Sequence, residues 1–283
     1  MIGVTGANGH LGKATLNHLL KSVKPENIVA IARNPLKLKE FENTGIQIRT
    51  ADYDQQESLN EALKGIDQLL QISTTSMGAL GIRQENNVVK AAEKLGVKHI
   101  VYTSGLKPNP ASHFFAVQQC LQTERAIVSS GIAYTFLRNS LYMETIPQFI
   151  GNALQEGNIY FPAGTGKVSF VYRDDIAEAL SNVLTEDQHH YKTYEVTGAE
   201  PFSFSDIANL LGIEKNLEIN YIDIPEAVLK DELIKSGMPE QECDWFLSLA
   251  QSIKADEFSY VDGTLEKLIR RKPITLNKYL ASL

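Results

Sequence analysis

Cysteines, long apolar runs and excess positive charge are all scarce in this sequence. Only two of its 283 residues are cysteines, Cys120 and Cys243, and their wide separation suggests neither a disulfide framework nor a metal site. No run of about 18 apolar residues occurs, so we expect no membrane span. The formal net charge of −7 disfavours nucleic acid and anionic membrane surfaces as partners. We expect a cytoplasmic protein, a monomer or a dimer, that binds small molecules.

Segments that alternate between apolar strands and amphipathic helices fill the first half of the chain. Glycines interrupt the first apolar run after five residues, so a secretory signal is not expected. Strands are predicted over 1–5, 27–33, 46–52, 67–73, 98–104 and 132–139, and helices over 11–22, 58–65, 83–96 and 118–131. This alternation, with strands that are almost continuously apolar, predicts an α/β fold with a doubly wound parallel sheet, the Rossmann type.

The regular alternation of strands and helices ends at about residue 150. We expect a Rossmann domain over 1–150 and a smaller, mostly helical substrate-side subdomain over 151–283, with segments at about 168–200 returning to the main sheet. Asp174 or Asp175 is predicted to cap a helix over 176–184. Further helices are expected over 204–212, 225–237 and 241–253. The cleft between the two parts is the expected substrate site.

Three glycines, Gly6, Gly9 and Gly12, separate the first strand from the first helix. A pyrophosphate can sit on a helix N-terminus there if Gly6 allows the turn, Gly9 the approach of phosphate and Gly12 the close packing of helix on strand. A glycine-rich turn without a ligand is the alternative. The position between a strand and a helix, at the start of a doubly wound pattern, favours a dinucleotide.

The spacing G-x-x-G-x-x-G after Thr5 resembles the short-chain dehydrogenase/reductase superfamily, in particular its extended and atypical members. The segments TGANGHLG, IARNP, ADYDQ, QIS, YTSG, LRNSLYME and FVYRDDIAEA resemble NmrA-like proteins in order and spacing. Among those, the chain is similar to bacterial NAD(P)H:quinone oxidoreductases of type 2. The resemblance covers residues 1 to about 200 well and the helical tail loosely.

The end of the second strand indicates which dinucleotide binds. An Asp or Glu there would favour NAD, whereas Arg33 can form a forked pair with a 2′-phosphate, with Asn34 as a further donor. NADPH is therefore the expected cofactor, although Arg33 could also be an ordinary surface arginine. The resemblance places Asp52 near the adenine; a turn role is the alternative. The full predicted cofactor set is Gly6, Ala7, Asn8, Gly9, His10, Leu11, Gly12, Arg33, Asn34, Asp52, Ile72, Ser73, Thr74, Thr103, Arg138, Asn139, Ser140, Leu141 and Tyr142.

The Tyr-x-x-x-Lys pair of many short-chain reductases is missing. By the resemblance its positions are Ala116 and Cys120, which cannot deliver a proton to an alkoxide. This loss disfavours unactivated ketones and sugar epimerisation, but a quinone stabilises by delocalisation the charge that hydride transfer leaves.

By resemblance, three residues are the catalytic candidates. Ser104 would bond a substrate oxygen, Asn139 would offer an amide and Tyr142 a flat wall; for Ser104 a turn cap and for Tyr142 simple packing are alternatives. Phe114, Phe115, Phe161 and Tyr172 could add apolar surface for a quinone ring, although core positions are the commoner role of such residues. No metal site is expected, because His189 and His190 read as a surface loop.

Three functional readings therefore remain open. The first is an NADPH-dependent oxidoreductase that transfers hydride to a quinone or a similar soft, small-molecule acceptor. The second is an NmrA-like regulator that senses NADP(H) without turnover, and a nucleotide-sugar epimerase is a third, less favoured reading. An aromatic-lined cleft beside the nicotinamide would favour the enzyme, whereas a blocked cleft or an exposed apolar patch would favour the sensor.

Overall fold

A seven-stranded parallel β-sheet forms the centre of the larger half of the molecule. The structure, a computed structural model, describes residues 1–283. The strands run in the order β3-β2-β1-β4-β5-β6-β9, and every neighbouring pair is parallel. Their bounds are β1 Ile2–Val4, β2 Ile28–Ala32, β3 Gln47–Thr50, β4 Gln68–Gln71, β5 His99–Gly105, β6 Ala133–Asn139 and β9 Lys192–Val196. All five residues of β2 are buried, as in a strand covered on both faces.

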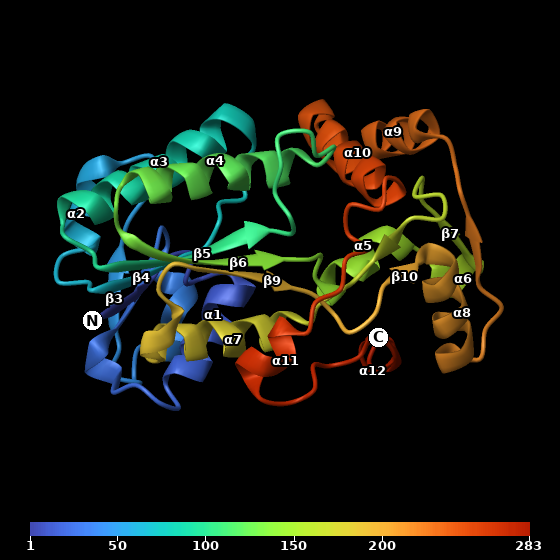
Figure 1. Ribbon diagram of the computed structural model, residues 1–283. Helices are drawn as coiled ribbons and strands as arrows, with labels where there is room; N and C mark the ends of the chain where they lie inside the picture. Colours follow the sequence, from blue (N-terminus) through green and yellow to red (C-terminus); the bar gives the residue numbers. More distant parts are fainter.

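Helices cover both faces of this sheet (Figure 1). One face carries α2 (Gln56–Ala62), α3 (Gly78–Lys94) and α4 (Phe115–Ser129), and the other carries α1 (His10–Leu19), α7 (Arg173–Thr185) and α11 (Thr264–Ile269). Two separate apolar clusters, one on each side of the sheet, fill the space between strands and helices. The doubly wound Rossmann architecture predicted from the sequence is confirmed.

A smaller, mostly helical part extends from the carboxyl edge of the sheet (Figure 1). Its elements are α5 Ile146–Ile150, α6 Ala153–Glu156, β7 Asn158–Tyr160, β8 Lys167–Val168, β10 Phe202–Ser203, α8 Phe204–Lys215, β11 Asn220–Ile222, α9 Glu226–Lys235, α10 Glu240–Lys254 and α12 Leu276–Ala281. Short 3-10 turns elsewhere are η1 Pro25–Asn27, η2 Pro35–Phe41, η3 Met143–Thr145 and η4 Asp187–His189. A third apolar cluster holds this part together, with Phe149 and Phe161 rings 5.1 Å apart. Helix α8 begins at a capping box, in which Ser203 and Asp206 bond each other's backbone N–H.

The chain crosses between the two parts more than once. After β8 it returns as α7 and β9, and β9 pairs with β6 from Thr135 opposite Lys192 to Asn139 opposite Val196. The expected cap of α7 by Asp174 or Asp175 is wrong, because the helix begins at Arg173 and Tyr172 precedes it without a side-chain cap bond.

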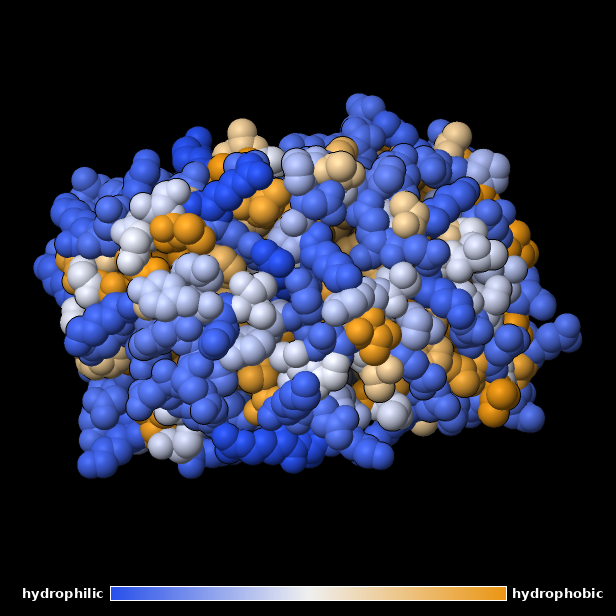
Figure 2. Space-filling view, viewed as in Figure 1, coloured by the Kyte–Doolittle hydropathy of each residue, from blue (hydrophilic) through white to orange (hydrophobic).

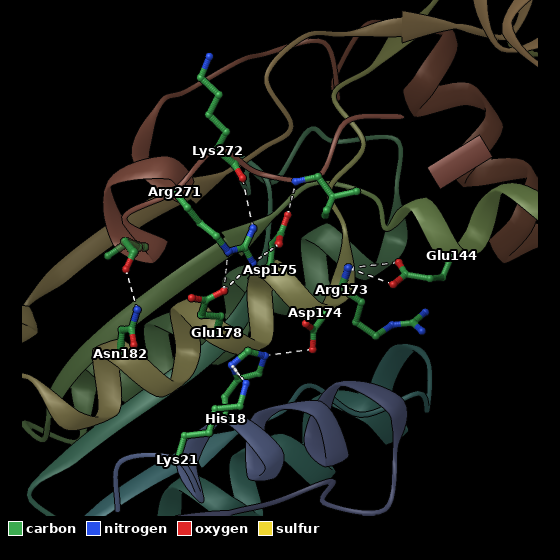
Figure 3. Close-up of polar contacts among 12 residues, drawn as sticks. His18, Lys21, Glu144, Arg173, Asp174, Asp175, Glu178, Asn182, Arg271 and Lys272 are labelled. Atoms are coloured by element: carbon green, nitrogen blue, oxygen red, sulfur yellow. Dashed lines mark hydrogen bonds and ion pairs between the residues drawn. The ribbon is translucent and has the colours of Figure 1, made fainter. Parts of the chain in front are cut away.

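Instead, the buried Asp175 carboxylate fastens the C-terminal segment to α7. It accepts hydrogen bonds from Arg271 Nη2 at 2.6 Å and from the backbone N–H of Ile274 at 2.7 Å (Figure 3). Glu178, one turn along the helix, also bonds the Arg271 guanidinium. The carboxylate therefore serves tertiary packing and not the helix terminus.

The outer surface is mainly polar. On the face drawn in Figure 2, hydrophilic residues predominate and hydrophobic ones form small separate areas. None of the helices combines the length and apolar content needed to cross a lipid bilayer.

Candidate active site

A cleft of about 1200 Å³ lies where the carboxyl edge of the sheet meets the smaller part. Its floor comes from the glycine turn after β1 and from the ends of β4, β5 and β6, and its far wall from α5, α9 and α10. This volume exceeds the roughly 300–1,000 Å³ typical of a site for one small ligand. The cleft can therefore hold a dinucleotide and a second molecule.

The glycine turn has the geometry that a pyrophosphate requires. Gly6 adopts a φ of +61°, and a Cβ on Gly12 would lie 2.4 Å from the carbonyl oxygen of Gly6. Gly9 precedes α1 without a side chain that could cap the helix. The N–H groups of His10, Leu11 and Gly12 make no hydrogen bond within the protein, so they are free to donate to an anion at the helix N-terminus.

The loop after β4 is held in place from beneath. The hydroxyl of Thr103 accepts the N–H of Ser73 at 2.9 Å, and the buried Glu85 carboxylate accepts the N–H of Thr74 at 2.9 Å. Glu85 also receives the hydroxyl of Tyr102 at 2.7 Å, while burial raises the pKa of this carboxyl. These bonds fix the backbone of Ser73 and Thr74 along the cleft without using any group that faces it.

Two buried polar side chains face the cleft without partners. Ser104 and Asn139 are only 5% and 6% exposed, and neither the Ser104 Oγ nor either amide atom of Asn139 has a hydrogen bond. They lie on adjacent strands, since Gly105 is paired with Asn139 in the β5–β6 register. A buried unpaired polar group costs about 1–3 kcal/mol, so this pair suits a ligand that supplies an oxygen and an N–H.

The titratable groups beside the missing pair are weak acids. Ala116 and Cys120, the positions of the missing pair, both face the cleft from α4. Burial raises the pKa of the Cys120 thiol to about 12 and that of Tyr142 also to about 12. Neither group loses its proton readily, so neither replaces the tyrosine of related reductases.

Aromatic rings cover the substrate end of the cleft. Phe114, Phe115 and Phe161 line it, whereas Tyr172 lies outside and packs on Tyr279 with ring centroids 6.2 Å apart. A second set of rings, not predicted from the sequence, also lines the cleft: Phe149, Tyr160, Trp245, Phe246 and Phe258. The one tryptophan of the chain, followed at once by a phenylalanine on a helix of the tail, was the available signal.

Most of the predicted site residues meet in this cleft. Those that line it are Gly6, Gly9, His10, Leu11, Gly12, Ile72, Ser73, Thr74, Ser104, Asn139, Ser140, Leu141 and Tyr142. Those that do not are Ala7, Asn8, Arg33, Asn34, Asp52, Thr103 and Arg138. Ala7 is fully buried and bonds the backbone of β2, and Thr103 acts beneath the loop as described above.

Arg33, Asn34 and Asp52 follow the ends of β2 and β3, at the edge of the sheet beyond the cleft. Arg33 is exposed and has no ion-pair or hydrogen-bond partner. The Asn34 side chain accepts the N–H of Leu36 at 3.0 Å, so its amide nitrogen stays available. The Asp52 carboxylate accepts the N–H of Asp54 at 3.0 Å, which gives it a turn role.

Arg138 does not reach the cleft. Its guanidinium is held by the Glu124 carboxylate at 2.7 and 2.9 Å and by Glu195 at 3.1 Å. Both acids come from elements that flank β6, so this arginine joins helix α4 to strand β9. The structure therefore assigns it a structural place instead of a cofactor contact.

The expected surface loop at the histidine pair is wrong for His189. This residue is 4% exposed, and its Nδ1 lies 2.8 Å from the Tyr194 hydroxyl, because β9 brings that tyrosine alongside. His190 is exposed and contacts the ring of His99 edge-on. No group of three or more His, Cys, Asp or Glu side chains is arranged to hold a metal ion.

Comparison with known proteins agrees with this architecture. The NmrA-like family matches residues 1–280. Quinone oxidoreductase 2 of Escherichia coli (strain K12) is 35% identical over 286 residues, covering 100% of this chain and 98% of the relative. The crystal structure of an NADPH-dependent quinone oxidoreductase from E. coli, complexed with NADPH, matches with a TM-score of 0.95 at 33% identity, over 100% of this chain and 99% of that one.

A second solved structure is similar over the same length. Citrobacter sp. triphenylmethane reductase, complexed with NADP(H), matches with a TM-score of 0.92 at 35% identity and covers 100% of this chain and 99% of its own. The NAD(P)H azoreductase of Xenophilus azovorans is 26% identical across 99% of this chain and 96% of the relative. The resemblance expected from the glycine turn onward is confirmed along the whole chain, which belongs to the NmrA-like family.

Proposed function

We propose that this protein is an NADPH-dependent oxidoreductase that transfers a hydride to a quinone or a similar soft aromatic acceptor. The observation that carries the proposal is the pair of unpartnered buried polar groups, Ser104 and Asn139, in a cleft that joins a glycine turn to an aromatic wall. The named activities of the relatives from E. coli and Citrobacter sp. support it.

The residues present fit NADPH. The free N–H groups of α1 would receive the pyrophosphate, and Arg33, exposed and unpaired, would receive the 2′-phosphate as a forked partner. Asn34 would donate its free amide nitrogen beside it. When bound, NADPH supplies the hydride. The protein's part is to hold the nicotinamide face to face with a flat acceptor, which is catalysis by proximity and orientation.

Side chains at the ends of β5 and β6 would position the acceptor. Ser104 can donate to one oxygen, the Asn139 amide can donate and accept, and Tyr142 provides a wall that keeps its own proton because its pKa is raised to about 12. Ala116 supplies no acid. The proton that completes reduction of a quinone to a hydroquinone therefore comes from water, after delocalisation has stabilised the charge.

The two parts of the chain have different roles in this proposal. We propose that residues 1–150 hold most of the cofactor and that 151–283, apart from the segments at about 168–200 that return to the main sheet, shape the acceptor side. Trp245 and Phe246 on the far wall support this. The net charge of −7 supports a small-molecule acceptor and disfavours nucleic acid. A reducing cytoplasm is the proposed location, since both cysteines are free and buried.

The experiment compares NADPH and NADH binding in Arg33→Asp. The substitution replaces a charge-assisted partner of the 2′-phosphate with a repulsive charge, so NADPH should bind more weakly by on the order of 2–4 kcal/mol, and NADH far less so. Lys37→Asp, an equal charge change at an exposed neighbour, is the matched control and should have a much smaller effect. Equal losses of NADPH and NADH in Arg33→Asp would remove Arg33 from this role.

Turnover is tested separately with a panel of quinones that includes benzoquinone and menadione. Steady NADPH oxidation, followed by its absorbance, is the expected result. Tight NADPH binding without oxidation by any quinone of the panel would contradict the proposed enzymatic activity and would favour a protein that senses NADP(H).

A further inference from the structure

One arginine in the cleft has no partner. Arg173 begins α7, and it is the only lysine or arginine among the residues that line the cleft. Its side chain is half-buried, yet its guanidinium has neither a hydrogen bond nor a carboxylate within ion-pair distance. Figure 3 shows the guanidinium pointing away from the carboxylates of Glu144 and Asp174, without a contact to either.

The other half-buried arginines show that this is unusual here. Arg49 donates to the backbone carbonyls of Ala62 and Lys64 at 2.8 and 2.7 Å, and Arg138 is held by two glutamates. A guanidinium withdrawn from water loses solvation that only an acceptor can restore. Arg173 is therefore the one half-buried guanidinium of the chain whose acceptor the protein does not supply.

The surroundings of Arg173 hold its side chain in position. Both carboxylate oxygens of Glu144 accept the backbone N–H of Arg173, at 3.1 and 3.3 Å, which fixes the start of α7. The guanidinium carbon lies 5.4 Å from the centre of the Tyr142 ring, within the range of a cation–π contact. The Glu144 carboxylate is thus engaged by the backbone N–H, and the five donors of the Arg173 guanidinium are left without an acceptor.

We propose that Arg173 binds the phosphate on the nicotinamide side of the cofactor's pyrophosphate. Two observations select this anion over an anionic acceptor. The cleft's two acidic side chains, Glu156 and Glu242, lie on the elements of the smaller part and would repel a negatively charged acceptor. Helix α7 also packs along α1 (Figure 1), and the glycine turn with the free N–H groups of α1 lines the same cleft as Arg173.

Strand order decides which phosphate it is. Arg33 follows β2, which three strands (β1, β4 and β5) separate from β6 in the sheet, so the 2′-phosphate and adenosine lie towards β2. Tyr142, on which Arg173 rests, follows β6. Arg173 is therefore at the opposite end of an extended dinucleotide, next to the phosphate that carries the nicotinamide ribose. This step rests on the proposed cofactor but not on its turnover.

The test measures binding without turnover, by calorimetry, of three ligands to wild type and Arg173→Gln. NADPH and 2′-phospho-ADP-ribose contain both phosphates of the pyrophosphate, whereas 2′,5′-ADP lacks the one on the nicotinamide side. We expect Arg173→Gln to weaken the first two on the order of 10- to 100-fold and 2′,5′-ADP at most about threefold. Arg173→Lys should recover only part of the loss, because an ammonium lacks the planar fork.

Two other results would contradict this role of Arg173. An equal loss of affinity for 2′,5′-ADP would show that Arg173 acts only through its positive charge and does not contact the phosphate on the nicotinamide side. Unchanged NADPH affinity with a raised KM for the quinone would show that Arg173 binds the acceptor. Either result overturns the proposal. Arg125→Gln, which removes an exposed arginine of α4, controls for net charge. If wild type bound no NADPH at all, the proposed function itself would fail, which is a distinguishable result.

Discussion

Two glycines of the turn should separate folding from cofactor binding when each is replaced by alanine. A Cβ on Gly12 would lie 2.4 Å from the Gly6 carbonyl oxygen and 2.7 Å from the Ala7 Cα, and both are backbone atoms that cannot rotate away. A Cβ on Gly9 would meet only the Gly6 oxygen, at 3.3 Å, and would otherwise face the cleft.

The expected magnitudes follow from these contacts. Gly12→Ala gains up to about 1 kcal/mol of helix propensity but forces α1 off the strand, at about 1–3 kcal/mol, so it should destabilise the fold by about 1–2 kcal/mol. Gly9 has a φ of −80° and a ψ of 167°, which alanine adopts freely. The lower entropy of the unfolded chain offsets the poorer helix cap, so the stability of Gly9→Ala should stay within about 0.5 kcal/mol of wild type.

NADPH binding should fall in both variants. In Gly9→Ala the new methyl group occupies the path of the phosphate to the backbone, and in Gly12→Ala the helix that donates to it has moved. Urea unfolding measures stability, and quenching of Trp245, the one tryptophan and a cleft residue, reports binding. NADPH binding by Gly9→Ala equal to that of wild type, or an equal loss of stability in the two variants, would contradict these roles of Gly9 and Gly12.

Two further predictions concern stability alone. Asp175→Asn removes the carboxylate that accepts hydrogen bonds from Arg271 and from the backbone, so it should lower the free energy of unfolding in urea by about 1–3 kcal/mol. Glu178→Gln, at a more exposed partner of Arg271, should lower it by at most about 1 kcal/mol. Equal effects of the two substitutions would contradict the role of Asp175 in holding the C-terminal segment on α7. Burial lowers the pKa of His99 from 6.5 to about 4, so the unfolded chain binds more protons between these values and stability should rise with pH from about 4 to 6.5, by a total of about 3 kcal/mol. His99→Gln should flatten that slope, and an unchanged slope would contradict the assignment.

The sequence predicts those parts of the structure that depend on neighbouring residues. Apolar runs and glycines between them predict the sheet strands up to β6 and the helices between them. The glycine spacing also places Gly6 correctly in the turn after β1 and Gly12 in the first turn of α1. These features depend on neighbours within one or two helical turns. The family resemblance gave Ala116 and Cys120 as the positions of the missing pair, and both line the cleft.

The rest depends on partners that lie far away in the chain. Arg138 binds Glu195, 57 residues later, and Asp175 binds Arg271, 96 residues later, so neither role can be read from local pattern. The ring of Trp245 looks like an ordinary core residue of an amphipathic helix until α10 is placed over the cleft. Contacts between residues far apart in the sequence therefore determine which charged side chains form ion pairs within the protein and which remain available to a ligand.

The position of β9 at the edge of the sheet sets an order for synthesis and folding. Strand β6 keeps an unpaired edge until residues 192–196 have been made, and the backbone N–H of Ser140, beside the unpartnered Asn139, bonds only then to the carbonyl of Val196. A fragment that ends near residue 150 would leave that edge open to other chains and the wall of the cleft unsupported. The part that looks like a complete nucleotide-binding domain therefore cannot finish its sheet before residues 192–196 of the second part have been synthesised.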